Sequence, residues 1–115
     1  LTNNLKLQTP EQRILGIWIM ENSPSDKIEF LPNGVVNIYI DNTLESTYNY
    51  IISNECNEII PSSSDNNENK LVLKYIYPEG DSFCNYILSG VYEDNSHTLS
   101  LLTEGQGKII VYMRP

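Results

Sequence analysis

Apolar residues recur along most of the chain in short runs that are separated by polar turn formers. The runs have the length of strands and are rich in Ile, Val and Tyr, which favour β-structure. Asn33-Gly34, Asp41-Asn42 and Glu79-Gly80 stand between them and are typical of tight turns. The pattern predicts about eight strands, which cover residues 16–21, 26–31, 35–40, 46–53, 71–77, 83–92, 97–102 and 108–113. Gly90, inside one of these ranges, predicts a bulge or bend.

The short spacing of these strands predicts an antiparallel, up-and-down meander. A meander of that many twisted strands usually closes into a barrel, because closure removes the exposed strand edges. Thr9-Pro10-Glu11 predicts one helical turn that ends near Gly16. We therefore expect an all-β domain over residues 11–115, preceded by a lead-in or tether over residues 1–10. The length suits one domain.

The composition narrows the partners that are expected. The chain has no Ala, and it carries 15 acidic against 7 basic residues, a net charge of -8. Nucleic acids and anionic membrane surfaces both attract basic proteins, so neither is an expected partner. No apolar run is long enough to span a membrane as a helix. The acidic balance suits a cationic partner, a neutral ligand or simply a solvated surface.

Cys56 and Cys84 are the two cysteines, and neither belongs to a metal-binding motif. They form either a disulfide or two buried thiols. We favour the disulfide, because the domain is small, β-rich and has the features of an exported protein. The expected locations are the periplasm, the outer-membrane surface or the medium. The chain begins at Leu1 rather than Met, so an export signal or a lipid anchor is expected to have preceded it.

Three residues resemble the lipocalin-like (calycin) pattern. Gly16 and Trp18 follow the helical lead-in, and Arg114 closes the last strand. In that superfamily a Gly-x-Trp begins the first strand, and a basic residue from the last strand packs over the indole ring. The hairpin at residues 30–34 also resembles small lipocalin-like exported lipoproteins of Bacteroidetes. The resemblance implies a barrel closed by these three residues. The alternative is a core Trp18 and a frayed terminal Arg114.

Catalytic and metal chemistry have little support in the sequence. His97 is the single histidine, and its neighbours Ser96 and Asp94 do not form a triad pattern, so a surface histidine is expected. Residues 65, 67 and 69 begin like a calcium loop, but Lys70 and Ile76 occupy its glycine and glutamate positions. We expect no catalytic residue, no metal and no cofactor.

Tyrosine is the unusual residue type, with 8 copies against 2 Phe and 1 Trp. By default these tyrosines replace phenylalanine in the core and on half-exposed faces. The alternative is a tyrosine-lined barrel mouth, since each ring offers apolar area and a polar tip to an amphipathic ligand. The candidate ligand-binding residues are Tyr48, Tyr50, Tyr75, Tyr77 and Tyr86.

These observations favour a non-catalytic binding module over an enzyme. The first hypothesis is a barrel that takes a small apolar or amphipathic molecule at its mouth. The second is a compact protein-interaction or inhibitor barrel that acts through its loops, such as residues 62–69, or through an exposed edge strand.

Overall fold

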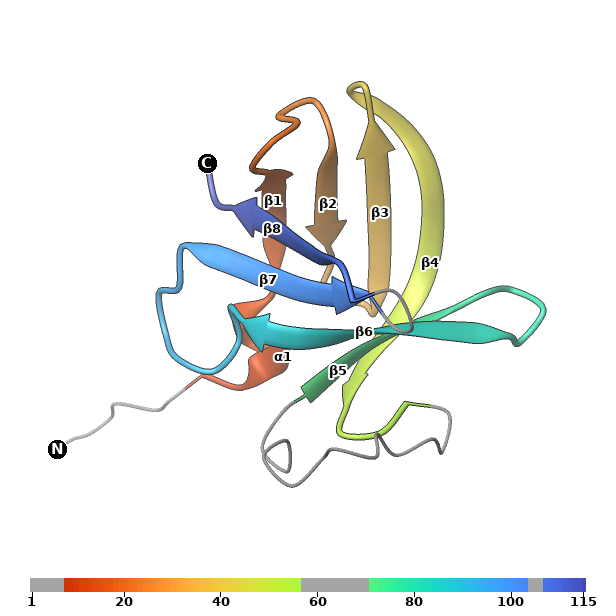
Figure 1. Cartoon of the computed structure of the whole chain (residues 1–115). Coiled ribbons are helices and arrows are strands. Elements are labelled where there is room, and N and C mark those ends of the chain that lie inside the picture. Colours follow the sequence, from red (N-terminus) through yellow and green to blue (C-terminus); the bar gives the residue numbers. More distant parts are fainter. Residues whose placement is uncertain (1–7, 57–70, 104–106) are drawn as a thin grey trace, which may run out of the picture.

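A computed structural model describes residues 8–56, 71–103 and 107–115. Eight antiparallel strands follow one another in chain order and close into a barrel, which confirms the predicted fold class (Figure 1). One helical turn precedes them. The elements are α1 (Pro10–Arg13), β1 (Gly16–Met20), β2 (Lys27–Phe30), β3 (Val35–Ile40), β4 (Thr43–Ser53), β5 (Leu71–Ile76), β6 (Ser82–Ser89), β7 (Thr98–Thr103) and β8 (Ile109–Met113).

The helical turn is built by local capping. The Thr9 hydroxyl accepts a hydrogen bond from the Gln12 backbone N–H, and the Gln12 side chain accepts one from the Thr9 N–H. This reciprocal pair satisfies N–H groups that a helix start leaves without partners. The turn ends at Arg13, earlier than the predicted end near Gly16. Gly16 has a φ of 110° and already belongs to β1.

Two strand boundaries differ from the prediction by more than one residue. β4 begins at Thr43 instead of residue 46, because Asp41 and Asn42 both adopt left-handed φ angles, 55° and 63°, and make a tight hairpin. β6 ends at Ser89 instead of continuing to residue 92, because Gly90, with a φ of 118°, turns the chain out of the sheet. The bend that Gly90 predicted is therefore the end of the strand.

Because successive turns of a meander lie at opposite ends of the barrel, each end has its own set of connections. We call one the α1 end. It carries α1, the turn at residues 31–34 and the connection from β6 to β7 (Figure 1). Arg13 of α1 hydrogen-bonds to Val91 and Asp94 in that connection. The other, which we call the far end, carries the turns at residues 21–26, 41–42 and 77–81.

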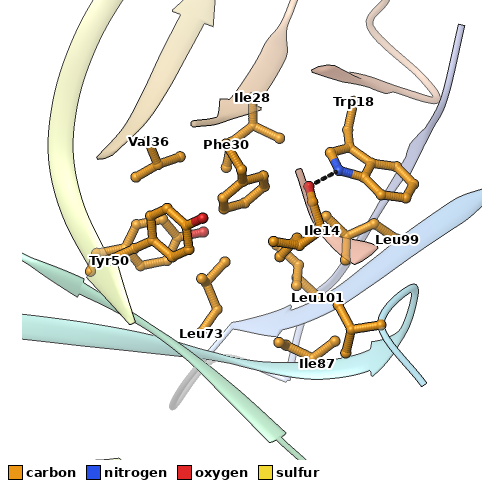
Figure 2. Packing of buried hydrophobic residues seen from close by; sticks show 12 residues of the cluster. Ile14, Trp18, Ile28, Phe30, Val36, Tyr50, Leu73, Ile87, Leu99 and Leu101 are labelled. Atoms are coloured by element: carbon orange, nitrogen blue, oxygen red, sulfur yellow. Dashed lines mark hydrogen bonds between the residues drawn. The ribbon is translucent and has the colours of Figure 1, made fainter. Parts of the chain in front are cut away.

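The core fills the barrel toward the α1 end. Figure 2 shows Trp18, Ile28, Phe30, Val36, Leu73, Ile87, Leu99 and Leu101 pointing toward one another, with Ile14 among them. Ile14 and Trp18 are fully buried. The Trp18 indole N–H donates to the Ile14 carbonyl at 2.8 Å, so the residue that follows α1 is tied to the first strand.

Candidate functional site

The contact between Trp18 and Arg114 that the sequence resemblance implies is present at the α1 end. The Arg114 guanidinium carbon lies 3.9 Å from the centre of the Trp18 ring, a cation–π contact. Arg114 also donates to the carbonyls of Leu15 at 3.1 Å, Ser96 at 3.1 Å and Arg13. A Cβ on Gly16 would lie 3.4 Å from Arg114 Nη1, so the glycine leaves room for the guanidinium. Arg114 is therefore held in place, and the interpretation as a frayed terminal charge is wrong.

Toward the far end, aromatic side chains gather from β4, β5, β6 and the turn that follows β5. The Tyr48 ring lies edge-on to Tyr75, Tyr77 and Phe83, with centroid distances of 6.0, 5.2 and 5.6 Å. Tyr75 stacks on Phe83 at 4.4 Å. We call these four residues the aromatic cluster. Their edge-to-face packing is a favourable arrangement for aromatic rings. The structure thus brings together three of the five tyrosines singled out in the sequence.

One ring of the aromatic cluster, Tyr75, brings a polar hydroxyl into the apolar interior of the barrel. Tyr75 is 3% exposed, and its hydroxyl accepts a hydrogen bond from the Asn85 amide at 2.9 Å. Burial, together with the nearby Tyr112 hydroxyl, raises the pKa of Tyr75. Burial, with Asp26 in second place, raises the pKa of Tyr112 to about 12. Both phenols are therefore neutral at physiological pH and can donate their protons.

Neither of these protons has an acceptor within the described part of the chain. The Tyr75 hydroxyl accepts from Asn85 and donates to no described residue, and the Tyr112 hydroxyl makes no hydrogen bond there. A tyrosine hydroxyl has one proton to donate. We call Tyr75, Asn85 and Tyr112 the interior polar group. Its three side chains come from β5, β6 and β8, and the two hydroxyls, on β5 and β8, can each donate to an acceptor atom.

The other two tyrosines of the candidate set lie elsewhere. Tyr50 belongs to the core near the α1 end, where its ring meets Phe30 edge-on at 5.1 Å and its hydroxyl donates to the Leu31 carbonyl at 3.3 Å. Burial, followed by the charge of Glu11, raises the pKa of Tyr50. Tyr86 packs outside the barrel against Cys56, Val72 and Cys84. The five tyrosines therefore do not form one lining.

A disulfide joins Cys56 and Cys84, as the sequence analysis favoured over two thiols. Both cysteines are buried, on the outer side of β5 and β6. The bond ties the chain that leaves β4 to β6, across β5. A disulfide of this kind is typical of proteins that fold in an oxidising compartment.

Sequence reasoning missed Phe83, Asn85 and Tyr112 as site residues. Alternation within the strands was the available signal. Phe83, Asn85 and Ile87 are spaced by two along β6, and Ile110 and Tyr112 are spaced by two along β8, so each set shares one face. Which face turns inward depends on how the barrel closes. From the sequence alone, a polar residue such as Asn85 is expected to face solvent.

The remaining sequence candidates carry no site for chemistry. His97 is exposed, as expected, and Asp94 is engaged by Arg13 at 2.8 Å instead of by the histidine. The calcium-like residues 65, 67 and 69 lie outside the described residues. Within the described ranges no three His, Cys, Asp or Glu side chains gather as a metal site would need. Nor does any helix there have the length and apolar character needed to cross a membrane.

Comparisons with known proteins leave the site to be interpreted from its geometry. No family model, curated protein or solved structure matches this chain.

Proposed function

We propose that this protein is an exported, non-catalytic, lipocalin-like binding protein. It takes a small amphipathic molecule into the barrel from the far end, with the ligand's polar end directed at the interior polar group. The closed eight-stranded barrel, the Trp18–Arg114 contact and the disulfide support the family and the location.

The observation that carries the proposal is the pair of unused donors on Tyr75 and Tyr112. A hydroxyl that is buried without an acceptor costs about 1–3 kcal/mol, so natural interiors rarely keep one. The buried Tyr75 hydroxyl and the nearby hydroxyl of the half-buried Tyr112 are the arrangement that a hydrogen-bond acceptor on a ligand would satisfy. A ligand that supplies the acceptor removes this free-energy cost, and the gain contributes to its affinity.

The interior polar group suits a neutral acceptor, such as the oxygen of a ketone, an ester or an amide. Both hydroxyls are neutral, and the charged group that acts on Tyr112 is the carboxyl-bearing Asp26. A carboxylate placed there would be buried beside another acid with no cation bonded to either hydroxyl in the described chain, which is unfavourable. The apolar part of the ligand would lie among the rings of the aromatic cluster, which contact one another in the empty protein and must separate as it enters.

A fluorescence titration tests this proposal. The probe is Prodan, an uncharged aromatic ketone whose emission reports both apolar surroundings and hydrogen bonds to its carbonyl. We expect saturable binding by the wild type. Tyr112→Phe removes one donor and is expected to raise the Kd about five- to tenfold, the value of one hydrogen bond. Tyr86→Phe, on the outer surface, is the matched control and is expected to leave the Kd unchanged.

The stability of the same variants separates this explanation from simple damage. Because Tyr112 makes no hydrogen bond to described residues, Tyr112→Phe is expected to raise the free energy of unfolding by about 1 kcal/mol while it weakens probe binding. Equal Prodan affinity for the wild type and both variants would contradict the proposal.

A second candidate function rests on the outer surface of β1 and β8. Ile17, Ile109 and Met113 are 41%, 55% and 40% exposed, and Met113 lies beside Ile19 where the two strands pair. Exposed apolar faces mark protein-interaction sites. Ile17→Glu is the discriminating variant: it would abolish capture of a protein partner but leave Prodan binding unchanged if the barrel binds a small molecule.

A further inference from the structure

A recess of about 330 Å³ lies on the outside of the α1 end, away from the interior polar group. It is lined by α1, by the connection from β6 to β7 and by the end of the chain. The residues that the argument uses are Gln12, Arg13, Asn95, His97 and Arg114. Arg114 is fixed beside His97 because its backbone N–H donates to the His97 carbonyl at 3.0 Å.

This recess collects basic side chains in an acidic protein. The chain contains only two arginines, Arg13 and Arg114, and a single histidine, His97, and all three line the recess although the sequence separates them by up to 101 residues. The whole chain has a net charge of -8. At physiological salt, charges beyond about 8 Å are largely screened, so the recess is governed by its own residues.

The Arg114 charge has no carboxylate partner in the described part of the chain, where the one ion pair joins Arg13 and Asp94. Burial lowers the pKa of Arg114, because desolvation disfavours the charged guanidinium. The guanidinium is held by three carbonyl oxygens and by the Trp18 ring, all neutral groups. A partly buried cation with neutral neighbours favours an anion at its open side.

The two guanidinium groups also keep N–H groups to offer. An arginine has five N–H donors, and the bonds to carbonyls occupy three on Arg114. Arg13 uses its Nε for Asp94 and its Nη1 for the Val91 carbonyl, and no described residue accepts from its Nη2. The planar fork of arginine matches the oxygens of carboxylates and phosphates. The Asn95 backbone, which adopts an unusual left-handed φ of 65°, completes the rim.

We propose that this recess is a binding site for a small oxyanion, either a carboxylate or a phosphate group, held between Arg13, Arg114 and His97. Among the described residues Asp94 is the one carboxylate that pairs with a lining arginine, and it engages Arg13, not Arg114. The site is separate from the barrel interior, and its occupant would secure α1 to the connection from β6 to β7.

The test is an NMR titration of the isotope-labelled protein with sodium phosphate and, separately, with sodium acetate, both at an ionic strength kept constant with sodium chloride. Backbone amides of residues 95–97 and the Nε–H groups of both arginines are followed. If only phosphate causes saturable shifts, the site binds phosphate groups. If only acetate does, it binds carboxylates. If both do, it binds either kind of oxyanion.

The variant is His97→Glu, which places a negative charge in the recess at an exposed side chain that makes no described hydrogen bond. This substitution is expected to raise the Kd of the anion at least about tenfold. Asn49→Glu adds the same charge at an exposed position on β4 and is expected to leave the affinity unchanged. Shifts that stay linear with both anions, or an equal loss of affinity in the two variants, would overturn the proposal.

Discussion

Gly90 is the position where a single methyl group is expected to do the most damage. It ends β6 with a φ of 118° and starts the connection that carries Asp94 and His97. A Cβ at this position would lie 2.7 Å from Leu99 Cδ1, 2.9 Å from Leu99 Cα and 3.0 Å from the Thr98 carbonyl oxygen. Two of these three atoms belong to the backbone of β7, so no change of rotamer relieves the clash.

The size of the effect follows from two terms. An L-residue in this region of φ costs about 1–3 kcal/mol. Overpacking against a well-packed core costs a further 1–3 kcal/mol, roughly. Gly90→Ala is therefore expected to lower the free energy of unfolding by about 4 kcal/mol. For a domain of this length that corresponds to a fall in Tm of about 16 °C.

Gly80 is the matched control. It has a similar φ of 107°, but a Cβ there would meet nothing within 4 Å. Gly80→Ala is expected to cost only the conformational term, about 2 kcal/mol. Urea unfolding followed by the fluorescence of the buried Trp18 measures both variants. Equal destabilisation would refute the reasoning, because it would mean that the approach of β7 to Gly90 contributes nothing.

Three further predictions concern other parts of the molecule. Replacing Cys56 and Cys84 together by Ser is expected to lower stability by about 3–4 kcal/mol in the chain-entropy model for a separation of 28 residues; an unchanged midpoint in urea would contradict it. Arg114→Met, which keeps an apolar chain over Trp18 but leaves three carbonyls without their donor, is expected to cost about 3 kcal/mol and to alter near-ultraviolet circular dichroism of the indole; a silent spectrum would count against the closing contact. Since burial raises the pKa of Tyr112 to about 12, the unfolded chain loses this proton first, so Tyr112 is expected to lower stability by about 2 kcal/mol between pH 10 and 12, in addition to the fall that the buried Tyr75 causes, and a Tyr112→Phe variant that shows the same total fall as the wild type would refute the assignment.

The sequence was sufficient for the parts of the fold that local chemistry determines. Turn formers at Asn33-Gly34 and Asp41-Asn42, with alternating Ile, Val and Tyr between them, specify hairpins, and hairpins in series specify a meander. The contact of Arg114 with Trp18 also followed, through the resemblance to lipocalin-like proteins.

The candidate sites depended on features that only the closed barrel supplies. Tyr86 and Tyr75 have similar neighbours along the chain, yet one lies outside against the disulfide and the other inside, because register decides which face turns inward. The pairing of Asn85 with Tyr75, and the gathering of Arg13, His97 and Arg114 around one recess, join residues from separate elements. Spacing along the chain contains no signal for either arrangement.

A crystal structure of the protein saturated with Prodan tests the central proposal most directly. We expect the probe inside the barrel, with its carbonyl oxygen at about 2.8 Å from the hydroxyl of Tyr75, Tyr112 or both, and its rings among Tyr48, Tyr77 and Phe83. Prodan on the outer face of β1 and β8, with ordered water bonded to the two hydroxyls, would contradict the proposal and favour a protein partner.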